Sequence, residues 1–518
     1  MSADYLIVGA GSAGCVLADR LSASGKRRVL LLEAGPVDRH PLIAMPKGMA
    51  RLYSDPRHIW LFGTTPERDI PAETWLRGKV LGGSSSINGM MYFRGHPDDY
   101  NEWVRRGGTG WGWDEMRRVF REIESTALQI SVPAERTPLT EAFIAAGQSL
   151  GVPRVEELSD AQQQGVGYPT QTVCKGRRQS AADAFLKPAR SRRNLRVETE
   201  VTVDRVLFEG KRAVGVSGHR GQVPVEYRTQ GEVILAAGAL QSPQLLERSG
   251  IGDAERLGAL GVRSIHHSPG VGENMLEHRL LMMRYQVLPR MSTNVQFHGW
   301  RLALHLARYA LTRTGLMATG SHDVGAFVKT QPHLSHPDVE ILMAPYSLTS
   351  TPKGNLATDS SNSMHLFGYP LRSRSQGSVH IQAAERSSGA VIRPNYLSDS
   401  YDQQVTVAMF RLMRRWMREP ALQGIAGAEL LPGAGVEDDT SILRAFRTQG
   451  GAGFHACGTA RMGGDDAVVD ARLRVRGVSS LRVIDGSVMP TMVSANTNAP
   501  IMAVAWRAAE LIREEERN

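Results

Sequence analysis

Three glycines near the start of the chain have the spacing of a phosphate-binding loop. In "YLIVGAGSAGCVLADRL", Gly9, Gly11 and Gly14 follow a short apolar run and precede a helical pattern of apolar residues. Gly9 permits a tight turn, Gly11 lets the backbone approach a pyrophosphate, and Gly14 lets the helix pack on the strand. The N-terminus of that helix would face the phosphates. The pattern predicts that a dinucleotide binds here.

An acidic residue at the end of the next apolar run supports this interpretation. "RRVLLLEAG" predicts a second strand that ends at Glu33, which is 19 positions after Gly14. A carboxylate at this place suits the two hydroxyls of a ribose and would repel a 2′-phosphate. A glycine-rich turn without a ligand is the alternative, and the combination of strand, helix, second strand and Glu33 argues against it.

A second segment is suited to lie against a cofactor. "LRGKVLGGSSSINGMMYFRGHPDDYNEW", residues 76–103, holds five consecutive small residues from Gly82 to Ser86. A backbone with so little bulk around it offers many hydrogen-bond donors to a flat or phosphorylated ligand. A flexible linker is the alternative, but the apolar runs "KVL" and "INGMMYF" on either side make it the weaker one.

Two further candidates lie near the C-terminus. "LRVIDG" predicts a strand from Leu481 to Ile484 with Asp485 at its carboxyl end, where open parallel sheets receive ligands. His455 lies in "GAGFHACGTARMGG", among small residues that allow a bulky partner to approach. A lone histidine is more often structural, but its glycine-rich loop favours a catalytic role.

A parallel sheet must position these candidates, and the chain predicts one. At 518 residues the chain is too long for a single ordinary core. "NLRVETEVTVDRVLFEGKRAVGVSG" predicts strands with a hairpin, and "GEVILAAGALQSPQLLERSGIG" predicts a buried strand that runs into a helix. Between about 290 and 440, helical and strand-like segments alternate, which indicates a separate domain that covers the substrate.

Composition excludes several classes of protein. Hydrophobic residues make up 42% and charged residues 22%, as in folded globular chains. The net charge is +9, but the densest basic groups, "KGRRQS" and "ARSRRNLR", have no interleaved aromatic residues, so we expect no nucleic-acid partner. Cys15, Cys174 and Cys457 lie far apart and support neither a disulfide framework nor a zinc site, and we expect no metal.

The expected location is the cytoplasm. The first strand begins at about residue 4, which leaves no room for a signal peptide, and no apolar run reaches the ~18 residues that a membrane span needs. The scattered cysteines fit a reducing compartment. A peripheral association with a membrane is compatible with all of these features.

Together these segments resemble the glucose-methanol-choline (GMC) oxidoreductases, flavoproteins that oxidise alcohols, over nearly the whole chain. "GKVLGGSSSINGMMYFRG" is similar to the first signature of that family and "GALQSPQLLERSGIG" to the second. "GRRQSAADAFLKPA", "PGVGENMLEH", "HACGTARMG" and "VIDGSVMPTMVSANTNAP" also fall in the family's order. The resemblance implies FAD where the glycine fingerprint alone would also allow NAD. Some members attach FAD covalently through a histidine just before the Asn of the first signature. Ile87 occupies that position here, so the resemblance implies that FAD is bound without a covalent link.

The resemblance places the FAD-binding residues in all of these segments. It implies that Glu33 and Ala34 contact the ADP half, that Val203 lies near the adenine, and that Asp485 and Asn496 lie on the flavin side. The full expected set is Gly9, Gly11, Ser12, Ala13, Gly14, Glu33, Ala34, Arg77, Gly82, Gly83, Ser84, Asn88, Gly89, Met90, Val203, Ala237, Gly238, Asp485, Gly486, Asn496 and Thr497.

The resemblance also implies the chemistry. His455 corresponds to the catalytic base and Asn496 to a second position that carries His or Asn in different members. The imidazole would accept the hydroxyl proton of a primary alcohol while its α-hydrogen leaves as hydride to flavin N5, and the amide would hold the oxygen. Asn498 competes with Asn496 for this role. Phe454 would either stack on a flat substrate or fill the domain interface.

Three features of the reaction stay open at this point. The electron acceptor is either oxygen, as in an oxidase, or a quinone or other acceptor, as in a dehydrogenase. A neutral primary alcohol, aromatic ones included, is the preferred substrate, because choline would need an anionic or aromatic cage and no acidic residue can be placed beside Trp60 and Phe62. A non-redox hydroxynitrile lyase with the same fold is the alternative function.

The predicted fold is therefore α/β (α+β overall). It consists of an FAD-binding, Rossmann-like parallel-sheet domain and a discontinuous antiparallel-sheet substrate domain that is capped by helices. Residues 1–150 are the first part of the FAD domain, and residues 151–285 are mixed, with a return to the FAD sheet at about 195–275. Residues 286–440 form the substrate domain, and residues 441–518 return to the FAD domain with His455 and Asn496.

Overall fold

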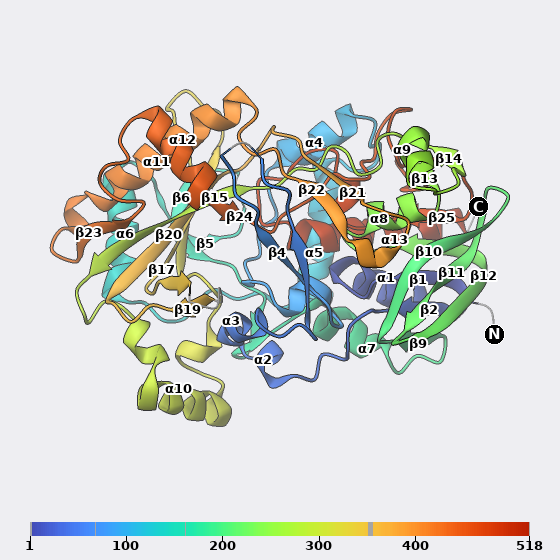
Figure 1. Cartoon of the computed structure of the whole chain (residues 1–518). Helices are drawn as coiled ribbons and strands as arrows, with labels where there is room; N and C mark the ends of the chain where they lie inside the picture. The colour runs from blue at the N-terminus through green and yellow to red at the C-terminus, as the bar shows by residue number, and fades with distance from the viewer. Residues whose placement is uncertain (1–2, 68, 161, 351–355, 517–518) are drawn as a thin grey trace.

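The structure is a computed structural model, and it describes residues 3–67, 69–160, 162–350 and 356–516. Two large β-sheets organise the chain (Figure 1). The sheet beside the two chain termini is mostly parallel, and the sheet at the other end of the molecule is mostly antiparallel. This architecture confirms the predicted mixed α/β fold.

The first sheet has a parallel core that the sequence pattern explains. It comprises β1 (Ala3–Val8), β2 (Val29–Leu32), β9 (Leu195–Glu198), β10 (Val201–Glu209), β11 (Arg212–Arg220), β12 (Val223–Leu235) and β25 (Leu481–Val483). The parallel order is β25, β12, β1, β2, β9. Strand β11 pairs antiparallel with the first part of β12, and β10 pairs antiparallel with β11. Strand β2 is buried along its whole length, as continuous apolar runs in parallel sheets are.

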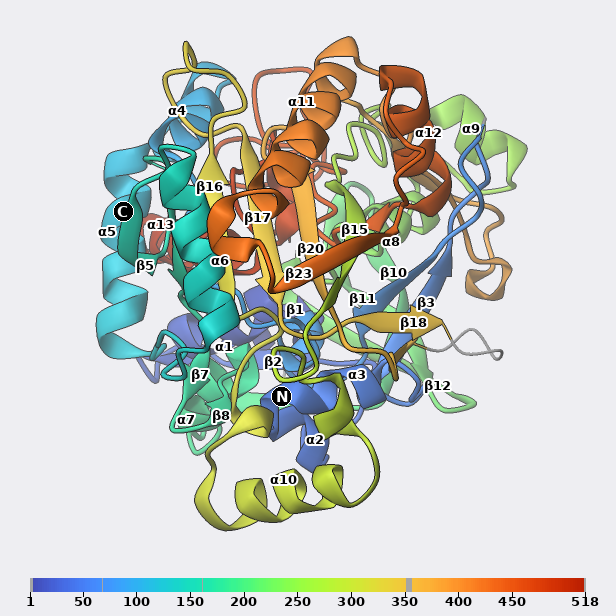
Figure 2. The same cartoon turned by 90° about the vertical axis from the view of Figure 1, so that its left-hand side faces the viewer.

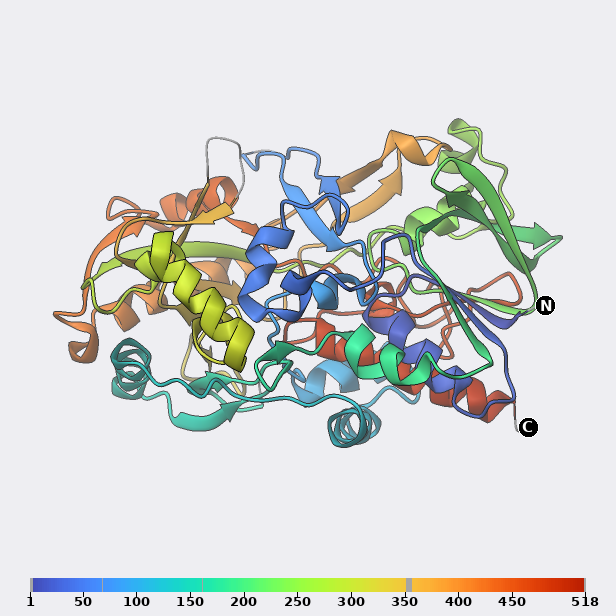
Figure 3. The same ribbon diagram turned by 90° about the horizontal axis from the view of Figure 1, so that it is seen from below.

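Two long helices pack against each other beside this sheet. They are α1 (Ser12–Ser22) and α13 (Asn498–Glu515), which lie at opposite ends of the sequence and side by side in space (Figure 3). Helix α1 starts directly after β1, and its N-cap residue Gly11 has no capping side chain. The first amides of α1 are therefore left for a ligand.

The second sheet contains eight strands from four parts of the chain. They are β5 (Arg154–Leu158), β6 (Gly165–Pro169), β15 (Arg279–Val287), β16 (Val324–Val328), β17 (Val339–Ala344), β20 (Ser363–Pro370), β23 (Ala426–Leu431) and β24 (Gly451–Ala452). Helices α6 (Pro138–Ser149), α11 (Ser400–Met417) and α12 (Asp439–Gln449) cover its outer face (Figure 2). The opposite face of this sheet is turned toward the part of the molecule that contains the first sheet.

Two hairpins lie between the sheets. Strands β3 (Ile59–Gly63) and β4 (Thr74–Gly78) form one, and β21 (Ser378–Ile381) and β22 (Ala390–Arg393) form the other. Strand β21 contacts α8 (Ser242–Arg248), where the buried Glu247 accepts a hydrogen bond from the Ile381 N–H at 2.7 Å and bonds His380 Nδ1 at 2.8 Å. This hairpin therefore packs on the part of the molecule that contains the first sheet, although its residues fall within 286–440, the predicted limits of the substrate domain. The domain limits remain a proposal.

The remaining elements are shorter or lie at the surface. They are α2 (Pro41–Ala44), α3 (Met49–Leu52), α4 (Pro97–Arg105), α5 (Trp113–Thr126), α7 (Lys187–Ala189), α9 (Ala254–Ala259), α10 (Gly299–Thr312), β7 (Val173–Cys174), β8 (Arg177–Arg178), β13 (Ile251–Gly252), β14 (His266–His267), β18 (Leu348–Ser350) and β19 (Leu356–Thr358). Helix α10 projects from the bottom of the molecule in Figures 1 and 2 and faces the viewer in Figure 3. None of the helices in the described residues is long and apolar enough to cross a membrane.

Candidate active site

A cavity of about 740 Å³ lies between the two sheets. Its wall contains His455 and all but two of the residues expected to bind the cofactor. These are Gly9, Gly11, Ser12, Ala13, Glu33, Ala34, Arg77, Gly83, Ser84, Asn88, Gly89, Met90, Val203, Ala237, Gly238, Asp485, Gly486, Asn496 and Thr497. The fold thus brings together segments that lie up to almost 490 residues apart in the sequence.

The glycines at one end of the cavity let backbones approach closely. Gly9 has φ of +99°, and a Cβ there would lie 2.6 Å from the Ala236 carbonyl oxygen. A Cβ on Gly83 would lie 2.6 Å from the Cα of Gly11. Any side chain at these positions would therefore displace backbone from the cavity wall. The result is a narrow, bulk-free passage beside the N-terminus of α1.

Gly14 and Gly82 do not line the cavity, and each has a structural role instead. A Cβ on Gly14 would lie 1.8 Å from the Gly9 carbonyl oxygen, so glycine is needed where α1 packs on the loop. Gly82 has φ of +88°, and its N–H donates to the Ala10 carbonyl at 2.8 Å. Both glycines shape the wall from behind.

Glu33 stands at the end of β2, as the spacing predicted. Its carboxylate accepts hydrogen bonds from the N–H groups of Ala10, at 2.9 Å, and Gly35, at 2.8 Å. Burial raises the pKa of Glu33 to about 7. The side chain therefore braces the glycine loop in addition to facing the cavity, which the sequence did not reveal.

Asp485 ties the ends of two parallel strands together. Its Oδ2 accepts from the Gly238 N–H at 2.7 Å and from the Ser242 hydroxyl at 2.6 Å, and its Oδ1 accepts from the Ser487 N–H at 2.8 Å. Gly238 follows β12 and Asp485 follows β25, so the carboxylate fixes both loops where the sheet receives a ligand.

His455 and Asn496 lie together at the other end of the cavity. Asn496 Nδ2 is 2.9 Å from His455 Nε2, and the Asn496 Oδ1 atom is buried with no hydrogen-bond partner among the described residues. Asn498 lies elsewhere, since its Oδ1 accepts from the Ser12 hydroxyl at 2.7 Å at the start of α1. The geometry therefore pairs His455 with Asn496 and not with Asn498.

A chain of hydrogen bonds defines which nitrogen of His455 carries a proton. His278 Nε2 is 3.0 Å from the Leu371 carbonyl oxygen, which can only accept, so His278 carries its proton on Nε2. His278 Nδ1 is then an acceptor, and it lies 2.9 Å from His455 Nδ1, which must donate. His455 Nε2 is therefore unprotonated, and its lone pair accepts from the Asn496 amide at 2.9 Å.

Burial keeps both rings neutral. It lowers the pKa of His455 well below its usual value, with further contributions from His278 and the Arg77 guanidinium. Burial also lowers the pKa of His278 to about 4. Below the rings, Glu277 accepts from the N–H groups of His455, at 2.7 Å, and His278, at 2.9 Å, and burial raises the pKa of Glu277 to about 7. At neutral pH, His455 is an unprotonated base.

Sequence reasoning missed three residues of this end of the cavity. Glu277 and His278 lie in "PGVGENMLEH", which was matched to the family without a role for either side chain. Tyr369 of β20 stacks on His278 with ring centroids 4.6 Å apart and lies 5.6 Å from the His455 ring. The sequence signal that could have identified Glu277 and His278 is an acidic residue directly followed by a histidine just before a strand.

Aromatic side chains form much of the rest of the cavity wall. The hairpin β3–β4 contributes Trp60 and Phe62, and β20 contributes Phe367 and His365. Phe454 lines the same cavity, with φ of +63° and a ring 5.8 Å from the Arg77 guanidinium. The carboxylate of Glu73, the residue before β4, also reaches the wall, but it forms an ion pair with Arg279.

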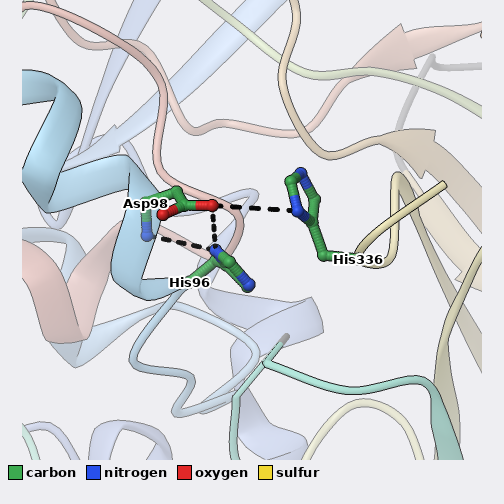
Figure 4. Close-up of side chains that lie close together, drawn as sticks. All are labelled: His96, Asp98 and His336. Atoms are coloured by element: carbon green, nitrogen blue, oxygen red, sulfur yellow. Dashed lines mark hydrogen bonds and ion pairs between the residues drawn. The ribbon is translucent and has the colours of Figure 1, made fainter.

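A separate group of possible metal ligands serves another purpose. Near α4, His96, Asp98 and His336 bring ring nitrogens and a carboxylate oxygen together (Figure 4). The Nδ1 atom of His96 accepts the Asp98 N–H at 3.1 Å, which caps α4. Burial, and then the charge of Arg372, lower the pKa of His96. A cation would compete with that cap and with the nearby guanidinium, so we assign the group to capping.

Comparisons with known proteins agree with this geometry. Two models described as GMC oxidoreductase match residues 3–280 and 373–505. The chain belongs to the GMC oxidoreductase family. It is 37% identical to an alcohol dehydrogenase [acceptor] of Pseudomonas putida, over 98% of this chain and 95% of that protein. It is 38% identical to an oxygen-dependent choline dehydrogenase of Photobacterium profundum, over 98% of this chain and 92% of that protein.

A solved structure extends the comparison. The crystal structure of pyridoxine 4-oxidase from Mesorbium loti has a TM-score of 0.87 and 31% identity, over 100% of this chain and 99% of that one. This GMC oxidoreductase is therefore an FAD-dependent enzyme that oxidises CH–OH groups, as the sequence predicted. The relatives do not support the lyase alternative.

The cavity of this GMC oxidoreductase fits FAD on its own features. Glycine backbones and the uncapped start of α1 suit a pyrophosphate, and Glu33 lies where a ribose is expected. At the other end, the Asn496 Oδ1 atom is buried without a partner among the described residues, so it can accept a hydrogen bond from a bound group.

Proposed function

We propose that His455 is the catalytic base and that Asn496 orients the alcohol. The neutral Nε2 atom of His455 faces the cavity, and this is the observation that carries the assignment. The substrate hydroxyl takes the place that the Asn496 amide now holds beside Nε2, and Nε2 removes its proton. The amide then donates to the substrate oxygen as that oxygen gains charge.

FAD, when bound, supplies the acceptor for the α-hydrogen and its two electrons. His278 keeps the proton of His455 on Nδ1, so that Nε2 stays free for each new substrate. Phe454 and Tyr369 exclude water from the space beside the base.

The same proposal assigns the cofactor residues. Glu33 holds the ribose of the adenosine, Gly11 and Gly83 border the pyrophosphate, and Asn88 and Met90 border the flavin. Ile87, which is buried and lines the cavity, cannot form a histidyl bond to the flavin, so FAD is held without a covalent link.

A neutral primary alcohol with an apolar or aromatic body fits the cavity best. Phe62 and Phe367 provide flat apolar surface, whereas the Trp60 ring lies against Lys79 and Arg386. The carboxylate of Glu73 is already neutralised by Arg279. A quaternary ammonium would therefore meet aromatic faces without a free anionic partner. The relatives include both alcohol and choline dehydrogenases, so the two substrate types must be compared directly.

The electron acceptor is either oxygen or a quinone or similar compound. We also propose a cytoplasmic location, which the unpaired state of Cys15, Cys174 and Cys457 supports.

Anaerobic flavin reduction with a panel of alcohols tests this proposal. Benzyl alcohol and a medium-chain primary alcohol should bleach the flavin, and choline should do so much more slowly. Air is then admitted, and peroxide release identifies an oxidase, whereas slow reoxidation by air with rapid reoxidation by a quinone identifies a dehydrogenase. Bleaching by choline alone would contradict the proposed substrate class.

A further inference from the structure

Helix α10 carries an apolar surface that nothing in the described part of the chain covers. Trp300, Leu304 and Leu311 are 67%, 59% and 85% exposed. Together with Leu306, they make up four of the ten most exposed large hydrophobic side chains among the described residues. Such clustering on one helix is unusual for a surface that faces only water.

The exposed residues form a stripe on the outer side of the helix. Trp300, Leu304, Ala307 and Leu311 are spaced by four, three and four positions, which places them on one side of an α-helix. Tyr309, on the opposite side, is buried, and its hydroxyl donates to the Ala44 carbonyl at 3.1 Å. The body of the protein therefore holds the inner side, and the exposed stripe faces away from it. Helix α10 projects from the body of the molecule in Figure 1.

The charged residues of α10 and of the segments that flank it in sequence are all positive. Arg301, Arg308 and Arg313 are exposed, and no Asp or Glu occurs in the sequence between Glu277 and Asp323. The Arg301 guanidinium lies 5.0 Å from the Trp300 ring, and the Arg313 guanidinium lies 5.0 Å from the Tyr309 ring. The segment thus combines exposed leucines and a tryptophan with flanking arginines and has no acidic residue of its own.

We propose that α10 binds the surface of an anionic lipid membrane. An amphipathic helix with Trp and Leu on one side and Arg beside them lies in the membrane interface, where the apolar side enters the acyl boundary and the guanidinium groups meet lipid phosphates. A second copy of the chain fits less well. In a twofold contact the same patch meets itself, so these arginines would face one another without a carboxylate between them.

The location of α10 gives this binding a consequence for access to the site. Helix α10 contacts the turn Leu316–Ala318, which contacts the turn Pro46–Gly48, and the next helix is α3. Met49 of α3 and the following Tyr53 line the cavity. Docking through α10 therefore brings this side of the cavity wall close to lipid, where apolar alcohols and quinones dissolve.

Sedimentation of the full-length holoenzyme with vesicles tests the proposal. The holoenzyme should bind vesicles of phosphatidylcholine with phosphatidylglycerol, and it should bind phosphatidylcholine alone much more weakly. Raised salt should weaken the binding to anionic vesicles. Leu311→Ser should lower the partition coefficient on anionic vesicles about tenfold, because one leucine side chain contributes about that much. The double change Arg301→Gln and Arg308→Gln should lower it by at least about tenfold on anionic vesicles and little on neutral ones.

Matched variants on another surface provide the controls. Val223→Ser, at a side chain that is 64% exposed on β12, and Arg263→Gln, at an exposed arginine, should leave partition unchanged. All variants should keep wild-type activity on a water-soluble alcohol. A holoenzyme that stays in the supernatant with anionic vesicles would overturn the proposal, as would equal losses in Val223→Ser and Leu311→Ser. Concentration-dependent dimers that Leu311→Ser abolishes, without vesicle binding, would assign the stripe to a second copy instead.

Discussion

Replacing His278 should slow catalysis, although in the proposed mechanism His278 acts only through His455 and does not contact the substrate. In His278→Phe, the aromatic ring can still pack on Tyr369, which lies 4.6 Å from the imidazole in the wild type. The acceptor for His455 Nδ1–H is lost, and that proton is left buried without a partner. Such a group costs about 1–3 kcal/mol, which shifts His455 toward the tautomer with its proton on Nε2. The fraction of competent base should fall about 10- to 100-fold.

Stopped-flow measurement of flavin reduction at saturating alcohol reads this loss directly. The limiting rate of reduction should fall by that factor, while the apparent dissociation constant of the alcohol and the spectrum of the bound flavin change little. His278→Gln is the matched control, because its side-chain carbonyl can accept the His455 proton and should restore part of the rate. A wild-type rate in His278→Phe, or equal losses in the Phe and Gln variants, would refute the tautomer assignment.

Three further predictions concern cofactor and stability. Acid precipitation should release about one FAD per chain, since Ile87 forms no link, and flavin in the pellet would contradict this. Glu33→Ala should lower FAD content and thermal stability together, because it removes the proposed ribose contact and the hydrogen bond to the Ala10 N–H. Alcohol oxidation per bound FAD should change less, and assays of flavin content and turnover separate the two effects. Burial raises the pKa of Glu340 to about 8, so its carboxyl binds a proton in the folded state that the unfolded chain has already released above about pH 4.5. Glu340 should therefore contribute about 2–3 kcal/mol to the drop in the free energy of unfolding between pH 6 and 8. Glu340→Gln should make the drop smaller by that amount in denaturant titrations, and the part that comes from Glu33 and Glu277 should remain.

The predicted cofactor half of the site depends on local patterns in the sequence. The spacing of the glycines, the strand that ends at Glu33 and the strand that ends at Asp485 each depend on neighbours in sequence, and the structure places all three beside one cavity. The double role of Glu33 could not be predicted, since its bond to the Ala10 N–H depends on how the loop folds back over β2.

Tertiary contacts decided what the sequence did not reveal. His278 and His455 are 177 positions apart, and only the antiparallel pairing of Leu276 with Cys457 brings their rings together. Likewise, the 3.6-residue period of "WRLALHLARYALT" predicted a helix but not which side of it faces solvent. Tyr309 and its bond to Ala44 settle that question in the folded chain.

The central claim, that His455 is the base and Asn496 its partner, is tested most directly by flavin reduction across pH. His455→Ala should reduce its flavin ~10²- to 10⁴-fold more slowly than wild type while it retains FAD. Asn496→Ala should lose ~1.5–3 kcal/mol of transition-state stabilisation, because it removes an orienting hydrogen bond and not the proton acceptor.

The pH profile of flavin reduction tests the protonation state of His455. Because burial lowers the pKa of His455, the unprotonated base persists into acid, so the wild-type rate should climb with pH only below about pH 6.5 and stay level at neutral pH. In His455→Ala this acid limb should disappear. A variant at position 455 that reduces its flavin at nearly the wild-type rate, with the acid limb intact, would remove His455 from the chemistry.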